Sequence, residues 1–128
     1  MRPSFVNLPK PFIVDVVTDT DPDSCIATIR NAEYDGAQAF DLHLRSLGLQ
    51  YHNQHDLERI IKSTWRPTMT IFYRDDSIWK TGLTDEDRAQ AHLLGLKAGS
   101  AACDIMGDMF DPSPILPMRS IVMSEIMT

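Results

Sequence analysis

Short apolar runs alternate with segments of helical period along most of the chain. The runs rich in β-branched or aromatic residues are FIVDVV (residues 12–17), AFDLHL (39–44), TMTIFY (68–73) and AACDIMGDMF (101–110). Their length and composition favour strands. Strands that alternate with helices predict a parallel sheet joined by right-handed crossovers. We therefore expect an α/β fold in which four strands pair in sequence order.

Turn and cap residues mark where the intervening helices should begin and end. Aspartate followed by proline is typical of a helix N-terminus, a Thr-x-x-Asp pattern predicts a capping box, and glycine is typical of a helix C-terminus. A proline also ends a helix at the preceding residue. The boundary signals in chain order are Asp21-Pro22, Asp35-Gly36, Arg66-Pro67, the pair Thr84 and Asp87, and Gly99.

Charged and titratable residues within the strands distinguish two α/β architectures. They are Asp15, Asp41, His43, Arg74, Asp104 and Asp108. An open sheet covered by helices on both faces would bury several of them at a large cost. A barrel tolerates them, because its mouth at the carboxyl ends of the strands is polar. The pattern favours TIM-barrel-like (βα) repeats, and since a closed barrel takes about 250 residues, we expect a half or truncated barrel.

The domain organisation is simple. The 128 residues correspond to one domain, with barrel-like βα repeats over about 11–110. A Pro- and Met-rich tail, DPSPILPMRSIVMSEIMT, follows over 111–128. Its short apolar run at 120–123 is either a fifth strand or part of an unattached arm.

Composition excludes several classes of partner. The net charge is −6, and no short window holds more than two Lys or Arg residues, which disfavours nucleic acid. No apolar run approaches the ~20 residues of a membrane helix, and prolines interrupt the N-terminus where a signal peptide would be apolar. Cys25 and Cys103 form no CxxC motif, so we expect small buried thiols in a cytoplasmic protein. No sequence motif indicates a cofactor or a metal.

The second strand carries the main candidate chemistry. Side chains alternate along a strand, so Asp41, His43 and Arg45 should share one face and the intervening apolar residues the other. Arg74 lies at the carboxyl end of the third strand. We expect a carboxylate, an imidazole and a guanidinium to converge at the barrel mouth. The alternative is a salt-bridge layer that closes the top of the barrel.

Three other signals favour ordinary structural roles. His52 and His55 have HxxH spacing, but no third ligand stands at a motif spacing, which favours solvated loop histidines. The alternating aspartates of TDTDPD (18–23) lack the glycine and closing glutamate of a calcium loop, which favours a cluster around a helix N-cap. His92, in the third helix, is expected to be a half-buried packing residue or a surface residue.

Two stretches resemble the type I 3-dehydroquinate dehydratases. GAQAFDLHLRSL resembles the GAD-hydrophobic-E-x-R-x-D stretch of that family. RPTMTIFYRDD followed by TDEDRAQAHLLGLKAGSAACDIMGDMF resembles its third strand, third helix and fourth strand. The resemblance covers about residues 12–110 and implies the N-terminal half of a TIM barrel. It also implies kinship with lyases of the shikimate and quinate pathways.

The resemblance carries over to few of the family's functional residues. By this comparison Asp41 falls on the strand-two glutamate, His43 on a substrate-binding arginine, and Arg74 on the arginine that grips the substrate carboxylate, if one residue is inserted before it. The Glu-Gly-Gly that follows this arginine in the family is absent. If residues 120–123 form the fifth strand, Ile126 stands at the position of the catalytic histidine. The Schiff-base lysine belongs to a sixth strand without a counterpart here, and the four lysines, Lys10, Lys62, Lys80 and Lys97, fall in predicted loops or helices.

Two functions from different classes follow. The resemblance implies an inactive or divergent dehydroquinase-like protein that binds a small hydroxycarboxylic acid or polyol through Asp41, His43 and Arg74. The alternative is a non-catalytic half-barrel module that acts through self-association or a protein partner.

The alternative rests on surfaces that a half barrel would leave uncovered. The first and fourth strands would have unpaired edges. Four apolar residues of the barrel interior should also be exposed, namely Ile13, Val17, Phe72 and Met106. Exposed apolar surface of this kind marks an interface. Either the methionine-rich tail folds back over this surface or a second copy of the chain covers it. Because three prolines within residues 112–117 stiffen the tail and limit its hydrogen bonding, we expect a twofold homodimer, the commonest closed assembly.

Overall fold

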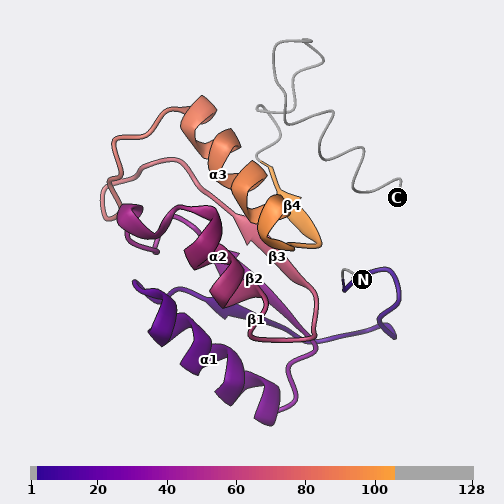
Figure 1. Ribbon diagram of the computed structural model, residues 1–128. Helices are drawn as coiled ribbons and strands as arrows, with labels where there is room; N and C mark the ends of the chain where they lie inside the picture. The colour runs from indigo at the N-terminus through magenta and orange to yellow at the C-terminus, as the bar shows by residue number, and fades with distance from the viewer. Residues whose placement is uncertain (1–2, 106–128) are drawn as a thin grey trace.

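The computed structural model describes residues 3–105, which form three βα units followed by a fourth strand (Figure 1). In chain order the elements are β1 (Val14–Val17), α1 (Pro22–Tyr34), β2 (Ala39–His43), the 3-10 helix η1 (Leu49–Tyr51), α2 (Gln54–Ile61), β3 (Thr68–Ile71), α3 (Asp85–Ala98) and β4 (Ala102–Asp104). The strands form one sheet in the order β1-β2-β3-β4, and all three neighbouring pairs are parallel. The predicted α/β class and the pairing in sequence order are confirmed. The tail, residues 120–123 and Ile126 lie outside the described residues.

The helix ends match the cap residues of the sequence. Asp21 accepts a hydrogen bond from the Ser24 N–H at 2.9 Å and caps α1. Thr84 and Asp87 form the reciprocal capping box of α3. Gly99 ends α3 with φ +116°, a conformation that favours glycine. Each of these signals acts within one turn of helix, which is why the sequence alone places them.

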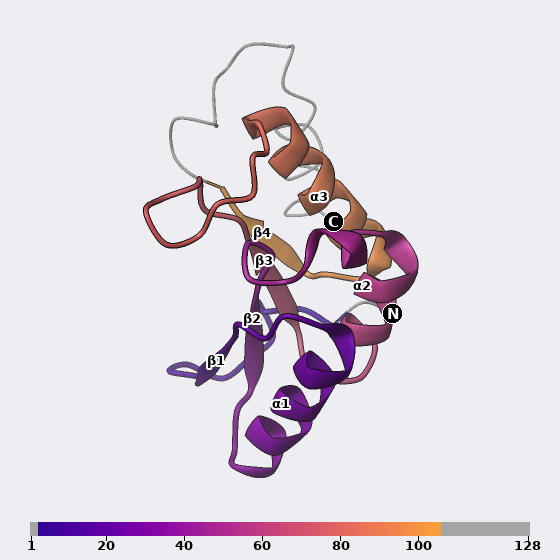
Figure 2. The same ribbon diagram turned by 90° about the vertical axis from the view of Figure 1, so that its left-hand side faces the viewer.

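All three helices lie on the same side of the sheet (Figure 2). α2 packs between its neighbours α1 and α3, as expected when each right-handed crossover joins adjacent strands. Neighbouring residues in a parallel ladder share a face, and Val17, Leu42 and Thr70 are paired in register. The centre of this covered face is fully buried: Val17, Thr70 and Phe40 are 0% exposed and Leu42 1%. Asp15 and Cys103, on the outer strands of the same face, are partly buried.

The opposite face is covered by none of the helices. We call it the open face; its strand residues are Val14, Val16, Ala39, Asp41, His43, Met69, Ile71, Ala102 and Asp104. Val14 is 37% exposed and Val16 49%. The open face therefore combines exposed aliphatic side chains on β1 with titratable ones on β2 and β4.

The predicted set of exposed interior residues is partly wrong. Val17 is 0% exposed and Phe72 2%, because their strand positions face the helices. Ile13 is 62% exposed, as predicted. Met106 lies outside the described residues. Alternation along a short apolar strand shows which residues share a face but not which face the helices cover.

Candidate functional site

Asp41 and His43 lie together on the open face of β2. They are two residues apart, so both side chains project from the same side of the strand. The distance between His43 Nε2 and Asp41 Oδ2 is 3.6 Å, and the two side chains are 21% and 15% exposed. The His43 ring meets the edge of Tyr73, with ring centroids 6.0 Å apart. The structure thus places a carboxylate beside an imidazole on the open face of the sheet.

The Asp41 carboxyl is poorly solvated. Its Oδ1 atom is buried without a hydrogen-bond partner. Burial raises the pKa of Asp41, the nearby His43 lowers it, and the charge of Asp104 on β4 raises it further. An acceptor oxygen of this kind is costly unless a donor reaches it. A hydroxyl or ammonium donor that reached Asp41 Oδ1 would therefore satisfy it.

Arg74 does not join this pair. It lies three residues beyond the end of β3, where its guanidinium binds Asp85 in the first turn of α3. Nε lies 2.9 Å from Oδ1, and Nη2 lies 2.6 Å from Oδ2. Among the contacts of residues 3–105, none joins Arg74 to Asp41 or His43, in contrast to the expected convergence. The side chain is 41% exposed, and a substrate carboxylate would have to compete with Asp85 for it.

Arg45, the third residue of the predicted polar face, is engaged as well. Its Nη1 donates to the Arg74 carbonyl at 2.7 Å and lies 3.1 Å from Asp76 Oδ2. The guanidinium also stands over the Tyr73 ring, 5.4 Å from its centroid. These contacts join the carboxyl end of β2 to the segment that follows β3.

Arg88 is a structural residue that the sequence reasoning missed. Its side chain is 4% exposed, and its guanidinium nitrogens lie 3.3 Å from both Asp75 and Asp85. It also stands over the Phe72 ring, 5.6 Å from the centroid. The sequence does indicate the pair with Asp85, because Arg88 follows Asp85 by three residues on the predicted helix and such residues are neighbours on a helix surface. This cluster, rather than an open cationic site, lies at the carboxyl end of β3.

The segment between β3 and α3, residues 72–84, is held by two adjacent aspartates. Asp75 accepts hydrogen bonds from the Thr81 hydroxyl and from the N–H groups of Thr81 and Gly82, which lower its pKa to about 2. The N–H groups of Trp79 and Ile78 lower the pKa of Asp76 in the same way. The charges of this segment therefore serve to fix its shape.

Two histidines correct two expectations, one partly buried and one fully buried. His52 is not a solvated loop residue: its Nε2 lies 2.9 Å from the Leu44 carbonyl and 3.1 Å from that of Leu47, and burial lowers its pKa. His55, by contrast, is exposed as predicted. His92 is only 1% exposed, and its Nδ1 lies 2.7 Å from the Thr70 hydroxyl. Burial lowers the pKa of His92 to about 4.

No strand carries a lysine. Lys62 is the C-cap of α2, Lys97 lies in the last turn of α3, and Lys10 and Lys80 lie in connecting segments. None of the four lysines therefore lies on β2, the strand that carries Asp41 and His43. An amine that forms an imine with a substrate must reach the reacting carbonyl, and the open face offers none.

The described part of the chain shows two further absences. Among residues 3–105, no group of three His, Cys, Asp or Glu side chains is arranged to hold a metal ion. No helix in that range is long and apolar enough to cross a bilayer. In comparisons of the sequence with known proteins, no family model and no curated protein matches the chain.

Proposed function

We propose that the chain is a non-catalytic half-barrel module that acts by associating with a second copy of itself. The observation that carries this proposal is the one-sided placement of the helices over a parallel sheet in sequence order. An eight-stranded βα barrel has the same order and the same outer ring of helices. Two copies would supply eight strands, with β1 of each copy beside β4 of the other.

The exposed apolar residues at one edge of the sheet support this arrangement. Ile13, Val14 and Val16 are 62%, 37% and 49% exposed, and they lie on or next to β1. Among residues 3–105, β1 pairs only with β2 and β4 only with β3. Unpaired strand edges and apolar patches both favour association. A twofold pair would bury both features at once.

The two cysteines support a cytoplasmic setting for this module. Cys25 and Cys103 are both free thiols, Cys25 fully buried and Cys103 partly so. Free thiols are usual in reducing compartments.

Sedimentation velocity tests the association. The chain is expected to sediment as a dimer, and Val16→Asp to sediment as a monomer because it places a charge in the apolar contact. Val6→Asp is the matched control: Val6 is 84% exposed in the N-terminal segment, and this variant should remain dimeric. A compact monomer at every concentration would overturn the proposal.

We further propose that the chain does not dehydrate 3-dehydroquinate, despite its resemblance to that family. The mechanism requires an imine-forming lysine and a proton-transferring histidine. No lysine lies on a strand, and if residues 120–123 form the fifth strand, Ile126 stands where that family has its histidine. Borohydride reduction in the presence of 3-dehydroquinate should leave the mass of the protein unchanged. A covalent adduct on any lysine contradicts this statement.

A second candidate function is the binding of a small hydroxycarboxylic acid or polyol at Asp41 and His43. The specific observation in its favour is Asp41 Oδ1, buried without a hydrogen-bond partner, since a ligand hydroxyl would supply the donor. Arg74 would hold the ligand carboxylate only by releasing Asp85, to which it is bound. Titration with shikimate-like acids separates the candidates, because only this one expects saturable binding that is lost in Asp41→Asn and weakened in Arg74→Gln.

A further inference from the structure

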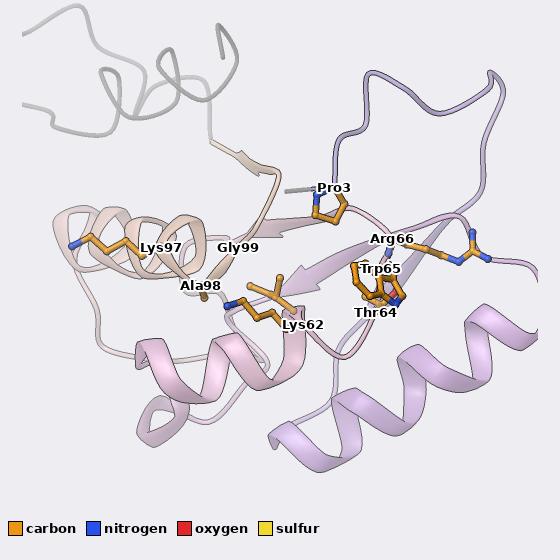
Figure 3. A pocket seen from close by; sticks show the side chains of 9 residues that line it. Pro3, Lys62, Thr64, Trp65, Arg66, Lys97, Ala98 and Gly99 are labelled. Carbon is orange, nitrogen blue, oxygen red and sulfur yellow. Dashed lines mark hydrogen bonds between the residues drawn. The ribbon is translucent and has the colours of Figure 1, made fainter. Parts of the chain in front are cut away.

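A cavity of about 490 Å³ opens at the amino ends of the strands, away from the Asp41–His43 pair (Figure 3). It lies where α2 and α3 end and where the chain turns back toward β3 and β4. Ile61, Trp65, Ala98 and Pro3 provide its apolar lining. This volume lies within the usual range of small-molecule sites, which are mostly apolar with a few polar groups.

Trp65 is the most unusual residue of this cavity. Its side chain is 93% exposed, although a tryptophan normally buries much of its surface. The backbone beside it is anchored, because the Thr64 hydroxyl donates to Glu33 and accepts from the Arg66 N–H at 3.0 Å. An anchored turn thus presents a free indole face at the rim of the cavity. A flat apolar ring could stack on it at little conformational cost.

The charged residues that line the cavity are all cations. They are Lys62, Arg66 and Lys97, in a chain of net charge −6. In Figure 3 Lys62 extends toward Ala98, whereas Lys97 and Arg66 extend to opposite sides. The Lys62 amine contacts Glu58, but this is an exposed i,i+4 pair, and such pairs are weak. Lys62 is therefore the cation best placed to meet an anion in the cavity.

The helix ends alone do not account for this charge. Helix C-termini attract cations because their last carbonyls carry partial negative charge. That effect explains Lys62 and Lys97, but Arg66 belongs to the turn before β3. Several of the last carbonyls are also satisfied, since Ser63 donates to the Ile60 carbonyl and Ser100 to that of Gly95. The Lys62 amine, which extends toward Ala98, is therefore available to an anion that displaces the exposed Glu58 contact.

We propose that this cavity binds a small aromatic carboxylate. The ring would stack on Trp65 and contact Ile61, and the carboxylate would face Lys62. Apolar contact supplies most of the affinity, and Lys62 selects an anion over a neutral ring. The proposal is independent of self-association and of the Asp41–His43 pair.

Fluorescence titration with 2-naphthoate tests it. The chain has two tryptophans, so Trp79→Phe leaves Trp65 as the single reporter. Trp79 lies in the segment 72–84, which follows the carboxyl end of β3, whereas the cavity lies at the amino ends of the strands. Saturable quenching of Trp65 by 2-naphthoate is expected, with weaker quenching by 2-naphthylmethanol, a neutral ring of the same size. Calorimetry on the unaltered chain gives the same comparison without a substitution.

A matched pair of lysine variants isolates the charge. Lys62→Gln should weaken 2-naphthoate binding by up to about fivefold, the effect of one exposed charge pair. Lys80→Gln makes the same charge change in the segment 72–84 and should leave the affinity unchanged. The proposal is overturned if no saturable quenching occurs, if the neutral ring binds as tightly as the carboxylate, or if both variants bind equally well.

Discussion

The two faces of this one sheet differ in what their side chains contact. On the covered face, Phe40 and Leu42 lie beneath three helices and are at most 1% exposed. On the open face, Val14 and Val16 are 37% and 49% exposed on a strand with one neighbour in the described sheet. The covered face therefore supplies most of the core, whereas the open face is exposed at β1 and buried at Ala39 and Ile71.

Two titratable groups, His92 beneath the helices and Asp41 on the open face, have pKa values that burial shifts in opposite directions. His92 contacts Thr70 beneath α3, and burial lowers its pKa to about 4. Asp41 stands on the open face, and burial raises its pKa. Desolvation disfavours the charged form in both cases. Histidine is charged when it is protonated and aspartate when it is deprotonated, so the two pKa values shift in opposite directions.

The largest expected difference between the faces is in core packing. Phe40→Ala should lower the free energy of unfolding by about 3–5 kcal/mol, because the cavity it leaves is enclosed by the helices. Val16→Ala should cost less than about 1 kcal/mol in the monomer, since half of that side chain is already in water. Urea unfolding at low protein concentration measures both. Equal losses would mean that the open face is part of the core.

A second difference is in the acid sensitivity due to His92. Its folded pKa of about 4 lies below the ordinary value of 6.5, so the stability it contributes is fully present above that value. This stability is lost as pH falls toward the folded pKa, up to about 3 kcal/mol at 1.36 kcal/mol per unit. Thermal unfolding against pH should show His92→Gln losing less stability on acidification than the unaltered chain. The exposed His55→Gln is the control and should behave as the unaltered chain does.

The smallest expected effect has the opposite sign and belongs to Asp41. A carboxyl with a raised folded pKa contributes stability that is fully present below its unfolded pKa and is lost as pH rises through the folded one. Asp41→Asn should therefore match or exceed the unaltered chain in stability near neutral pH and lose that advantage in acid. Asp35→Asn, at an exposed position, serves as the matched substitution. An advantage that grows in acid would contradict the assigned direction.

Local signals in the sequence predicted the elements, whereas tertiary contacts decided the site. The strands and their parallel order follow from apolar runs separated by helices, and the caps at Asp21, Thr84 and Gly99 act within one turn. The binding of Arg74 to Asp85 depends on how the segment after β3 reaches α3, which no spacing reveals. The burial of Phe72 depends on which face the helices cover.

The burial of His92 could have been predicted from the sequence. It lies three residues after Ala89 and four before Leu96, both of which are buried, and this is the spacing of one helix face. A histidine on such a helix face is expected among core residues. The partner, Thr70, comes from a strand and could not be identified from the helix alone.

Amide hydrogen exchange on the unaltered chain, at low and at high protein concentration, tests the open-face interface most directly. If two copies associate through this face, residues 13–17 should exchange more slowly at high concentration, and the exposed outer side of α1 should be unaffected. Val16→Asp should remove the concentration dependence. Exchange in residues 13–17 that is the same at every concentration would contradict the account.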